Sequence, residues 1–203
     1  MEIVIATRNA GKLREIARIM APIVCRSHTE IASIPDLDAV ETGATYLENA
    51  EMKARRTAGV TGGIVAADDS GLEVDALGGR PGVMSARYGG HGLSDEERCA
   101  LLLRELEGTP AEGRGARFVC VAAVVFPDGT LKTFMGECRG TIAFSPAGSN
   151  GFGYDPVFFV PRYGKTIAEL TAEAKDGVSH RGEAFGKVRE WLLRAGGAPG
   201  GRE

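Results

Sequence analysis

Short apolar runs alternate with stretches of helical spacing along most of this chain. Runs typical of buried strands cover residues 2–6, 23–27, 64–67, 117–126, 131–144 and 157–160. The tetrapeptide Pro-Asp-Gly-Thr at 127–130 predicts a hairpin turn. Residues 72–76 either continue the 64–67 strand or return from it, and Gly136 and Gly140 are possible breaks in the 131–144 strand.

Apolar positions three or four residues apart predict the helices. These cover residues 12–20, 45–58, 94–107, 166–174 and 183–194. Two of them begin with capping-box spacing, Thr45 with Glu48 and Ser94 with Glu97. Glycine-rich stretches at 78–92 and 145–156 predict loops, and residues 196–203 predict a flexible tail.

Alternation of strands and helices in the first half, with a strand hairpin in the second, indicates the α/β class. We expect a long mixed β-sheet flanked by helices, arranged as two lobes with an active-site cleft between them. Residues 1–195 are predicted to form a single domain, because 203 residues suit one large domain or two small lobes.

Composition narrows the function classes. The net charge of −3 implies no broad basic surface, so nucleic acid is not an expected partner. Apolar runs are too short to cross a membrane, and no basic leader precedes the first strand, so we expect a cytoplasmic protein. The four cysteines form no CxxC pair, which favours small core residues in a reducing compartment over a zinc site.

Two adjacent carboxylates, Asp68 and Asp69, follow the 64–67 run and precede Ser70 and Gly71. We expect them where the chain leaves the sheet, which is where open α/β sheets bind ligands. Carboxylate oxygens are hard ligands that suit Mg²⁺, and Mg²⁺ commonly binds together with phosphates. The alternative is that Asp-Asp-Ser-Gly is only a turn, since each of these residues favours turns.

The segment 6–12, Ala-Thr-Arg-Asn-Ala-Gly-Lys, joins the first strand to the first helix. Free N–H groups and the dipole of a helix N-terminus attract anions. A Walker-type NTPase is excluded, because the segment begins with Ala and Leu13 stands where Ser or Thr would hold Mg²⁺. Thr7, Asn9 and Lys12 could still grip a triphosphate; the alternative is that Thr7 or Asn9 only caps the helix.

Two later segments carry groups that suit a nucleobase. The loop 150–156 places two aromatic residues and an acid among glycines, and an aromatic ring can stack on a base, worth about 1–3 kcal/mol. Lys175 and the Ser-His-Arg at 179–181 are rich in hydrogen-bond donors, which prefer a purine O6 over an adenine amino group. Alternatively, the aromatic loop is anchored in the core, and 179–181 simply starts the last helix.

In this order, the segments resemble the inosine/xanthosine triphosphate pyrophosphatases, also called dITP/XTP diphosphatases. The matching blocks are residues 7–12; 41–43 with 48–50 and 53–54; 67–71; 152–156; and 173–175 with 179–181. Residues 77–82 and 85–88 also look like segments of this family. Each block is weak evidence, but the ordered set is specific and extends from Ile3 to about Leu192.

The resemblance implies a homodimer that hydrolyses ITP, dITP and XTP to the monophosphate and pyrophosphate with Mg²⁺. It implies that Asp69 is catalytic, binding metal and activating water, with Asp68 and Glu41 as further metal residues. The substrate-binding residues that it implies are Thr7, Arg8, Asn9, Ala10, Gly11, Lys12, Lys53, Ser70, Phe152, Gly153, Tyr154, Asp155, Lys175, His180 and Arg181.

Three alternatives remain open at this point. The first is a related pyrophosphatase for modified pyrimidines, against which Lys175 and residues 179–181 argue. The second is a non-catalytic nucleotide-binding regulator, against which the intact pair Asp68 and Asp69 argues. The third is a small RNA- or DNA-binding protein, which the mildly acidic charge disfavours.

Overall fold

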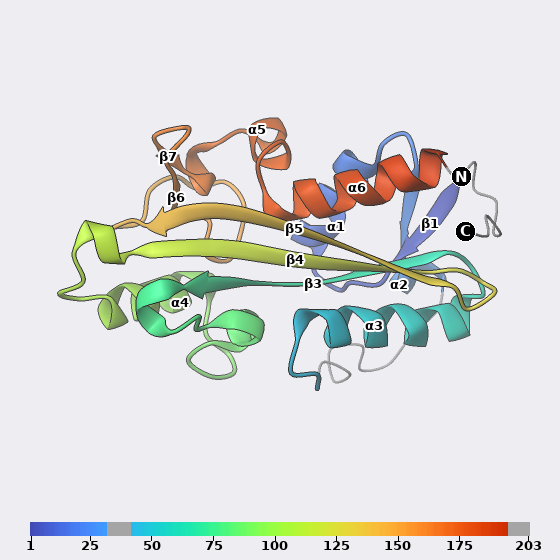
Figure 1. The fold of residues 1–203 in the computed structure, drawn as a ribbon, viewed down its shortest axis with the longest axis horizontal. Helices are drawn as coiled ribbons and strands as arrows, with labels where there is room; N and C mark the ends of the chain where they lie inside the picture. Colours follow the sequence, from blue (N-terminus) through green and yellow to red (C-terminus); the bar gives the residue numbers. More distant parts are fainter. Residues whose placement is uncertain (32–41, 195–203) are drawn as a thin grey trace. The chain divides into compact units, whose positions relative to one another are not determined.

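The structure, a computed structural model, describes residues 1–31 and 42–194. Within these residues, seven strands form one sheet in the order β2-β1-β3-β4-β5-β6-β7 (Figure 1). The strands are β1 (Glu2–Ile5), β2 (Val24–Ser27), β3 (Val65–Val74), β4 (Gly115–Val125), β5 (Leu131–Ile142), β6 (Phe158–Val160) and β7 (Lys165–Thr166). β1 runs parallel to β2 and β3, whereas β6 is antiparallel to β5 and β7. The predicted mixed sheet is therefore confirmed.

The described residues form six α-helices, which include four of the five predicted ones with starts within three residues of the prediction. They are α1 (Ala10–Met20), α2 (His28–Ile31), α3 (Tyr46–Thr61), α4 (Asp95–Glu105), α5 (Ala172–Asp176) and α6 (His180–Arg194). Thr45 and Ser94 are N-caps with complete capping boxes, so both predicted helix starts are confirmed. These caps satisfy backbone N–H groups that a helix start otherwise leaves without partners.

The chain divides into two compact units, in line with the two lobes expected. Unit 1 comprises Met1–Asp69, Cys120–Gly136 and His180–Glu203. Unit 2 comprises Ser70–Val119 and Glu137–Ser179. The single domain and the cleft between lobes stay predictions.

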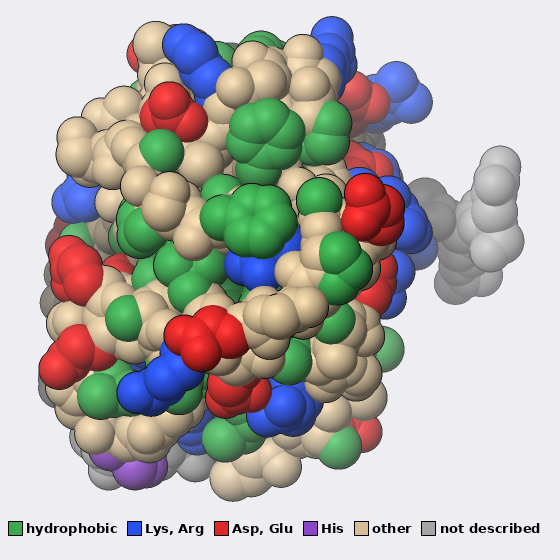
Figure 2. Space-filling model, turned by 90° about the vertical axis from the view of Figure 1, so that its left-hand side faces the viewer, with side chains coloured by type: hydrophobic (Ala, Val, Ile, Leu, Met, Phe, Trp, Pro, Cys, Tyr) green, Lys and Arg blue, Asp and Glu red, His purple; other side chains and the backbone are tan. Residues whose placement is uncertain are grey.

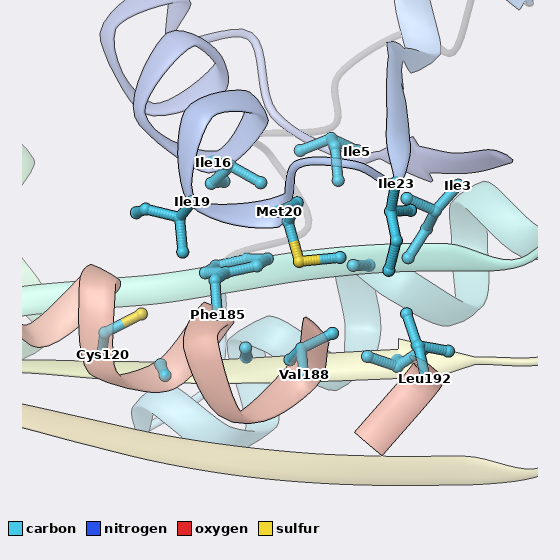
Figure 3. Packing of buried hydrophobic residues seen from close by; sticks show 14 of the residues in the cluster. Ile3, Ile5, Ile16, Ile19, Met20, Ile23, Cys120, Phe185, Val188 and Leu192 are labelled. Carbon is cyan, nitrogen blue, oxygen red and sulfur yellow. The ribbon is translucent and has the colours of Figure 1, made fainter. Parts of the chain in front are cut away.

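In unit 1, helices cover both faces of the sheet. α1 and α6 lie on one face and α3 lies on the other (Figure 1). Figure 3 shows Ile16, Ile19 and Met20 of α1 packed near Phe185 and other apolar residues of α6. On the α3 side, a second cluster of small residues includes Ala50, Ala54 and Ala67. Helix α1 is thereby fixed on one face and α3 on the other, and both contribute candidate site residues.

Unit 2 has a core of its own, in which Leu102, Phe118 and Phe158 are buried. Figure 2 shows the side of the molecule that carries β6, β7 and α4, with hydrophobic side chains at its centre and basic and acidic ones interspersed around them. This face carries no continuous basic surface among the residues described.

The expectation that the sheet ends at Asp68 was wrong. β3 runs without interruption from Val65 to Val74, so Asp-Asp-Ser-Gly lies inside a strand, and the turn alternative is wrong too. The predicted strand and its possible continuation are one element. Local turn preference is overridden here because β3 lies between β1 and β4 in the sheet.

Other boundaries also differ. Residues 166–174 form a short 3₁₀ turn (Ile167–Glu169) and then α5, not one helix, and the 78–92 loop contains the 3₁₀ helix Gly82–Arg87. β5 is unbroken at its two glycines. A Cβ on Gly136 would collide with the backbone of His180, so this glycine allows a close approach rather than a break. The predicted tail lies outside the described residues.

Candidate functional site

The turn between β1 and α1 is built as a helix start that faces solvent. Asn9 caps α1, its side chain accepting from the backbone N–H of Lys12 at 3.0 Å, and Thr7 Oγ1 accepts from Asn9 N–H at 3.2 Å. The capping alternative is therefore confirmed for Asn9. Residues 7–12, including Arg8, Ala10 and Gly11, are exposed or half-buried, so the same turn is accessible to an anion at the helix N-terminus.

Lys12 reaches back over β3 to Asp68. Its Nζ lies 2.9 Å from Asp68 Oδ2, and Arg181 Nη2 lies 3.5 Å from the same oxygen. Burial of Asp68 opposes its ionisation, but the charges of Lys12 and Arg181 outweigh it and hold the pKa of Asp68 well below its usual range. Asp68 is therefore an ionised carboxylate at neutral pH although only 1% of the residue is exposed.

Arg181 is almost fully enclosed among carboxylates. Its Nη1 donates to Glu15 Oε2 at 2.6 Å, and the residue is 2% exposed. Burial alone would lower the pKa of Arg181, but Asp68 and Glu15 raise it, so the guanidinium stays charged. Arg181 begins α6 next to His180, which is also buried. The role of both residues in base recognition stays a prediction.

Asp69 contacts two residues of α3 instead. Asn49 Nδ2 donates to Asp69 Oδ2 at 3.0 Å, and Lys53 Nζ lies 3.7 Å from Asp69 Oδ1. Asn49 Oδ1 also accepts from Gly43 N–H at 2.8 Å, which ties the start of α3 to the same carboxylate. Glu41, the other predicted acidic residue at the metal, lies outside the described residues.

The donor set around Asp69 suits a magnesium ion bound mainly by substrate and water. Within residues 1–31 and 42–194, no group of three or more His, Cys, Asp or Glu is arranged to hold a metal. Mg²⁺ needs no such group, because it often uses one or two carboxylates together with waters and phosphate oxygens. Asp69 supplies a hard, charged oxygen, so this residue fits that ion.

The predicted base loop is ordered by a buried ion pair in unit 2. Lys175 Nζ pairs with Asp155 Oδ2 and lies 4.8 Å from the ring centroid of Phe152. The same Asp155 oxygen accepts from Phe152 N–H at 3.0 Å. Gly151 has φ +80°, and a Cβ there would collide with Asp155, so only glycine fits.

The two aromatic side chains of this loop have different environments. Phe152 lines a cavity of about 360 Å³ together with residues of α4, so it borders open space. Tyr154 is 4% exposed within the unit 2 core, and its hydroxyl donates to the Ser85 carbonyl at 3.0 Å. The core-anchor alternative therefore describes Tyr154, whereas Phe152 remains accessible for stacking.

The candidate residues fall into one group in each unit. In unit 1, Lys12 pairs with Asp68 and Lys53 with Asp69. In unit 2, Lys175 pairs with Asp155 in the loop that carries Phe152 and Gly153. Ser70 is the half-buried first residue of unit 2 on β3. One shared site for both groups stays a prediction.

Sequence reasoning missed several contacts of these groups. No sequence motif singles out Glu15, although it lies three residues after Lys12 and therefore on the same side of α1. Asp95 and Cys99 of α4 were also missed; they hydrogen-bond the backbone N–H and carbonyl of Gly153. No local signal in the sequence indicates the contacts between α4 and Gly153, because the helix and the loop are far apart in sequence.

Comparison with known proteins agrees with this arrangement. A model of the Ham1 family matches residues 3–191. The chain belongs to the Ham1 family. The matched region contains every candidate residue, so the family resemblance seen in the sequence is confirmed.

Relatives and solved Ham1 structures match nearly the whole chain. A dITP/XTP pyrophosphatase of Geobacillus kaustophilus is 49% identical over 201 residues, 97% of each chain. One of Geobacter sulfurreducens is 50% identical, covering 94% of this chain and 96% of the relative. The Ham1 protein of Staphylococcus aureus has a TM-score of 0.84 at 44% identity, covering 96% of this chain and 100% of that one. The fold described above is thus the Ham1 fold.

Proposed function

We propose that this protein is a nucleoside triphosphate pyrophosphohydrolase that removes ITP, dITP and XTP, releasing the nucleoside monophosphate and pyrophosphate. The observation that carries the proposal is the similarity of nearly the whole chain to proteins named dITP/XTP pyrophosphatases, with 49% and 50% sequence identity. Two lysine–carboxylate pairs on neighbouring residues of β3, Lys12 with Asp68 and Lys53 with Asp69, support the same chemistry.

The reaction centre in this proposal is Asp69, with Glu41 as a second acidic residue and Mg²⁺ as the metal. Mg²⁺ would stabilise the charge that develops on the phosphate oxygens. Asp69 accepts the proton of the water that attacks the α-phosphorus. Asn49 orients the carboxylate for this step through its 3.0 Å hydrogen bond.

Phosphate binding is assigned to the α1 start and to Lys53. The exposed residues 7–12 present the helix N-terminus, which favours anions. Lys12 and Lys53 neutralise charge on the departing pyrophosphate, and preorganised cations of this kind stabilise the transition state without reorganising. Ser70 follows Asp69 on β3 and contacts the substrate beside it.

Base selection is assigned to the Phe152 loop and to three cationic or polar side chains. Phe152 stacks on the purine, and Lys175, His180 and Arg181 donate to O6. An adenine amino group would leave such donors unpaired, at a cost of about 1–3 kcal/mol for each. Guanine also carries O6, so these donors distinguish ITP from ATP rather than from GTP.

The proposal also includes a location in the cell and an oligomeric state. Among the residues described, no helix combines the length and apolar character needed to cross a membrane. A cytoplasmic location is proposed because the substrates belong to the nucleotide pool. A homodimer is also proposed, and light scattering after size exclusion tests it by giving twice the 21.4 kDa of one chain.

A triphosphate panel tests the function. Purified protein is incubated with ITP, dITP, XTP, ATP, GTP, dTTP and UTP, with Mg²⁺ or with excess chelator, and products are identified by ³¹P NMR. The expected result is pyrophosphate and monophosphate from the deaminated purines, at least tenfold faster than from ATP, and none with chelator. Release of inorganic phosphate, or faster turnover of dTTP or UTP, would contradict the proposal.

The remaining alternatives predict other outcomes. A regulator would bind ITP without releasing pyrophosphate. A nucleic-acid-binding protein would shift RNA or DNA on a gel with strong salt dependence.

A further inference from the structure

Asp68 uses one oxygen to hold two cations from different helices. Its Oδ2 accepts from Lys12 of α1 at 2.9 Å and from Arg181 of α6 at 3.5 Å. The carboxylate side chain is fully buried, and the side chains of Lys12 and Arg181 are 16% and 2% exposed. Such a contact is well shielded from solvent and from salt, so it can hold both cations in fixed places.

Asp68 and Asp69 point to opposite faces of β3. Successive side chains of a strand alternate between the faces of a sheet. The cations that contact Asp68 come from α1 and α6, whereas Asn49 and Lys53, which contact Asp69, come from α3. α1 and α6 lie on one face of the sheet in unit 1 and α3 on the other (Figure 1).

The neighbouring alanines show the same alternation. Ala66 packs in the cluster formed with α1 and α6, and Ala67 packs in the cluster that includes α3 residues. Mg²⁺ holds its oxygens at about 2.0–2.1 Å in near-ideal octahedral geometry. Side chains that leave opposite faces of one strand do not converge on one such ion.

We propose that Asp68 is a positioning residue rather than a metal ligand: it anchors Lys12 for the triphosphate and fixes Arg181 between α1 and α6. The proposal rests on the proposed function, because it assigns a task within that reaction. Metal chemistry is then left to Asp69 and Glu41, and Asp68 acts only through its two cations.

Glu15 explains how the anchor is made rigid. Arg181 donates to Glu15 through Nη1 at 2.6 Å and to Asp68 through Nη2 at 3.5 Å, so its guanidinium bridges α1 and β3. Glu15 lies one turn after Lys12 on the same helix. Removing the charge of Asp68 would leave Lys12 and Arg181 as neighbouring cations without their shared anion. Arg181 would keep Glu15, so their repulsion would displace the half-buried Lys12.

The test separates triphosphate binding from metal binding. Affinity for α,β-methylene ITP, which resists cleavage between the α- and β-phosphates, is measured by calorimetry in excess chelator. Mg²⁺ dependence is measured separately, as the concentration that gives half-maximal turnover at saturating ITP. Asp68→Asn is expected to weaken binding of the analogue without metal at least tenfold. The Mg²⁺ concentration that gives half-maximal turnover is expected to stay within twofold of the wild-type value. Asp69→Asn is expected to spare metal-free binding.

A double mutant shows whether Asp68 acts through Lys12. In a Lys12→Met background, Asp68→Asn should weaken analogue binding clearly less than it does in the wild-type background, because only the contribution through Arg181 is left. Glu73→Gln is the matched control, since it removes a carboxylate of the same strand that pairs with Arg117 instead, and it should change neither quantity. Asp68→Glu keeps the charge and should restore part of the binding; this variant carries the test if Asp68→Asn does not fold.

The opposite pattern overturns the proposal. A tenfold higher Mg²⁺ requirement in Asp68→Asn or Asp68→Glu, with metal-free analogue binding unchanged, would make Asp68 a metal ligand. If Asp68→Asn lowered the affinity for the analogue equally in the wild-type and Lys12→Met backgrounds, the anchoring role would also be contradicted. Failure of the proposed function is recognised separately, because wild-type protein would then release no pyrophosphate from ITP.

Discussion

Asn49 illustrates how one neutral side chain can orient a reactive carboxylate. It is 1% exposed, and it joins Asp69 to the backbone of Gly43 through two hydrogen bonds of 3.0 and 2.8 Å. Buried hydrogen bonds of this kind are expensive to lose, at about 1–3 kcal/mol when a partner is left unsatisfied. Asn49 therefore contributes to stability and to the site together.

We expect Asn49→Ala to lower the free energy of unfolding by about 1–3 kcal/mol and turnover of ITP by at least roughly tenfold. Urea unfolding and steady-state kinetics measure the two effects. Arg55→Gln, an exposed change on the same helix, is the control. A variant with unchanged stability and turnover would show that the contact with Asp69 has no role.

Asp68 should make stability depend on pH in the acid range. Its pKa is lowered on folding below the usual value of 3.8, so the folded state favours the ionised form. The stabilisation is fully present above about pH 4 and is lost as pH falls further toward the lower pKa of the folded state.

The variant Asp68→Asn should therefore lose less stability than wild type between about pH 4 and pH 2, while being less stable at neutral pH. Urea titrations across this range measure the difference. Parallel pH curves for the two proteins would contradict the lowered pKa.

At the scale of elements, α4 and the Phe152 loop are joined through one peptide group. Asp95 Oδ2 accepts from Gly153 N–H at 2.6 Å, and Cys99 Sγ donates to the Gly153 carbonyl at 3.4 Å. Gly153 has φ +62°, a backbone conformation that favours glycine. The helix start thus fixes the loop that carries the proposed stacking ring.

Asp95→Ala should raise KM for ITP by roughly tenfold, with a smaller change in kcat, because a charge-assisted hydrogen bond that orders the base loop is lost. Steady-state kinetics with ITP and ATP measure this and the accompanying fall in selectivity. Glu96→Ala, on the same turn, removes an equal charge without that hydrogen bond and serves as control. Unchanged KM in Asp95→Ala would mean that the loop is ordered without α4.

Local signals explain which elements could be predicted. Thr45 and Ser94 mark helix starts through contacts within four residues, so sequence reasoning placed α3 and α4 well. The prediction for the Asp-Asp-Ser-Gly segment was wrong because its turn preference is local, whereas its place in a strand depends on the neighbouring strands of the sheet. The opposite orientation of Asp68 and Asp69 could not be predicted either, because it depends on β3 continuing through both residues.

At the scale of the molecule, three strands supply residues to both compact units. β3, β4 and β5 each cross a unit boundary, at Asp69, Val119 and Gly136. Local unfolding of one unit would therefore interrupt strands that continue into the other. This continuity supports the prediction that residues 1–195 behave as one domain.

Differential scanning calorimetry should accordingly show one unfolding transition, with equal calorimetric and van't Hoff enthalpies. Two resolved transitions, or a calorimetric enthalpy well above the van't Hoff value, would contradict the single domain. The scan should use protein at several concentrations, because dimer dissociation would make the transition concentration-dependent.

The candidate site could be predicted only as a set of ordered motifs. Each predicted residue type suits its chemistry, and Lys12 and Lys53 do reach the two carboxylates. The enclosure of Arg181 by Glu15 and Asp68 could not be predicted, because it depends on the packing of α1 against α6 across the chain. Tertiary contacts therefore decide which of the motif residues remain available to substrate.

The most direct measurement is the turnover of ITP by Asp69→Asn at saturating Mg²⁺, with folding verified by thermal unfolding. Our account predicts that kcat for pyrophosphate release falls by about 10²–10⁴-fold, the contribution typical of a positioned general base. A folded Asp69→Asn protein with near wild-type kcat would contradict the assignment of the reaction to this carboxylate.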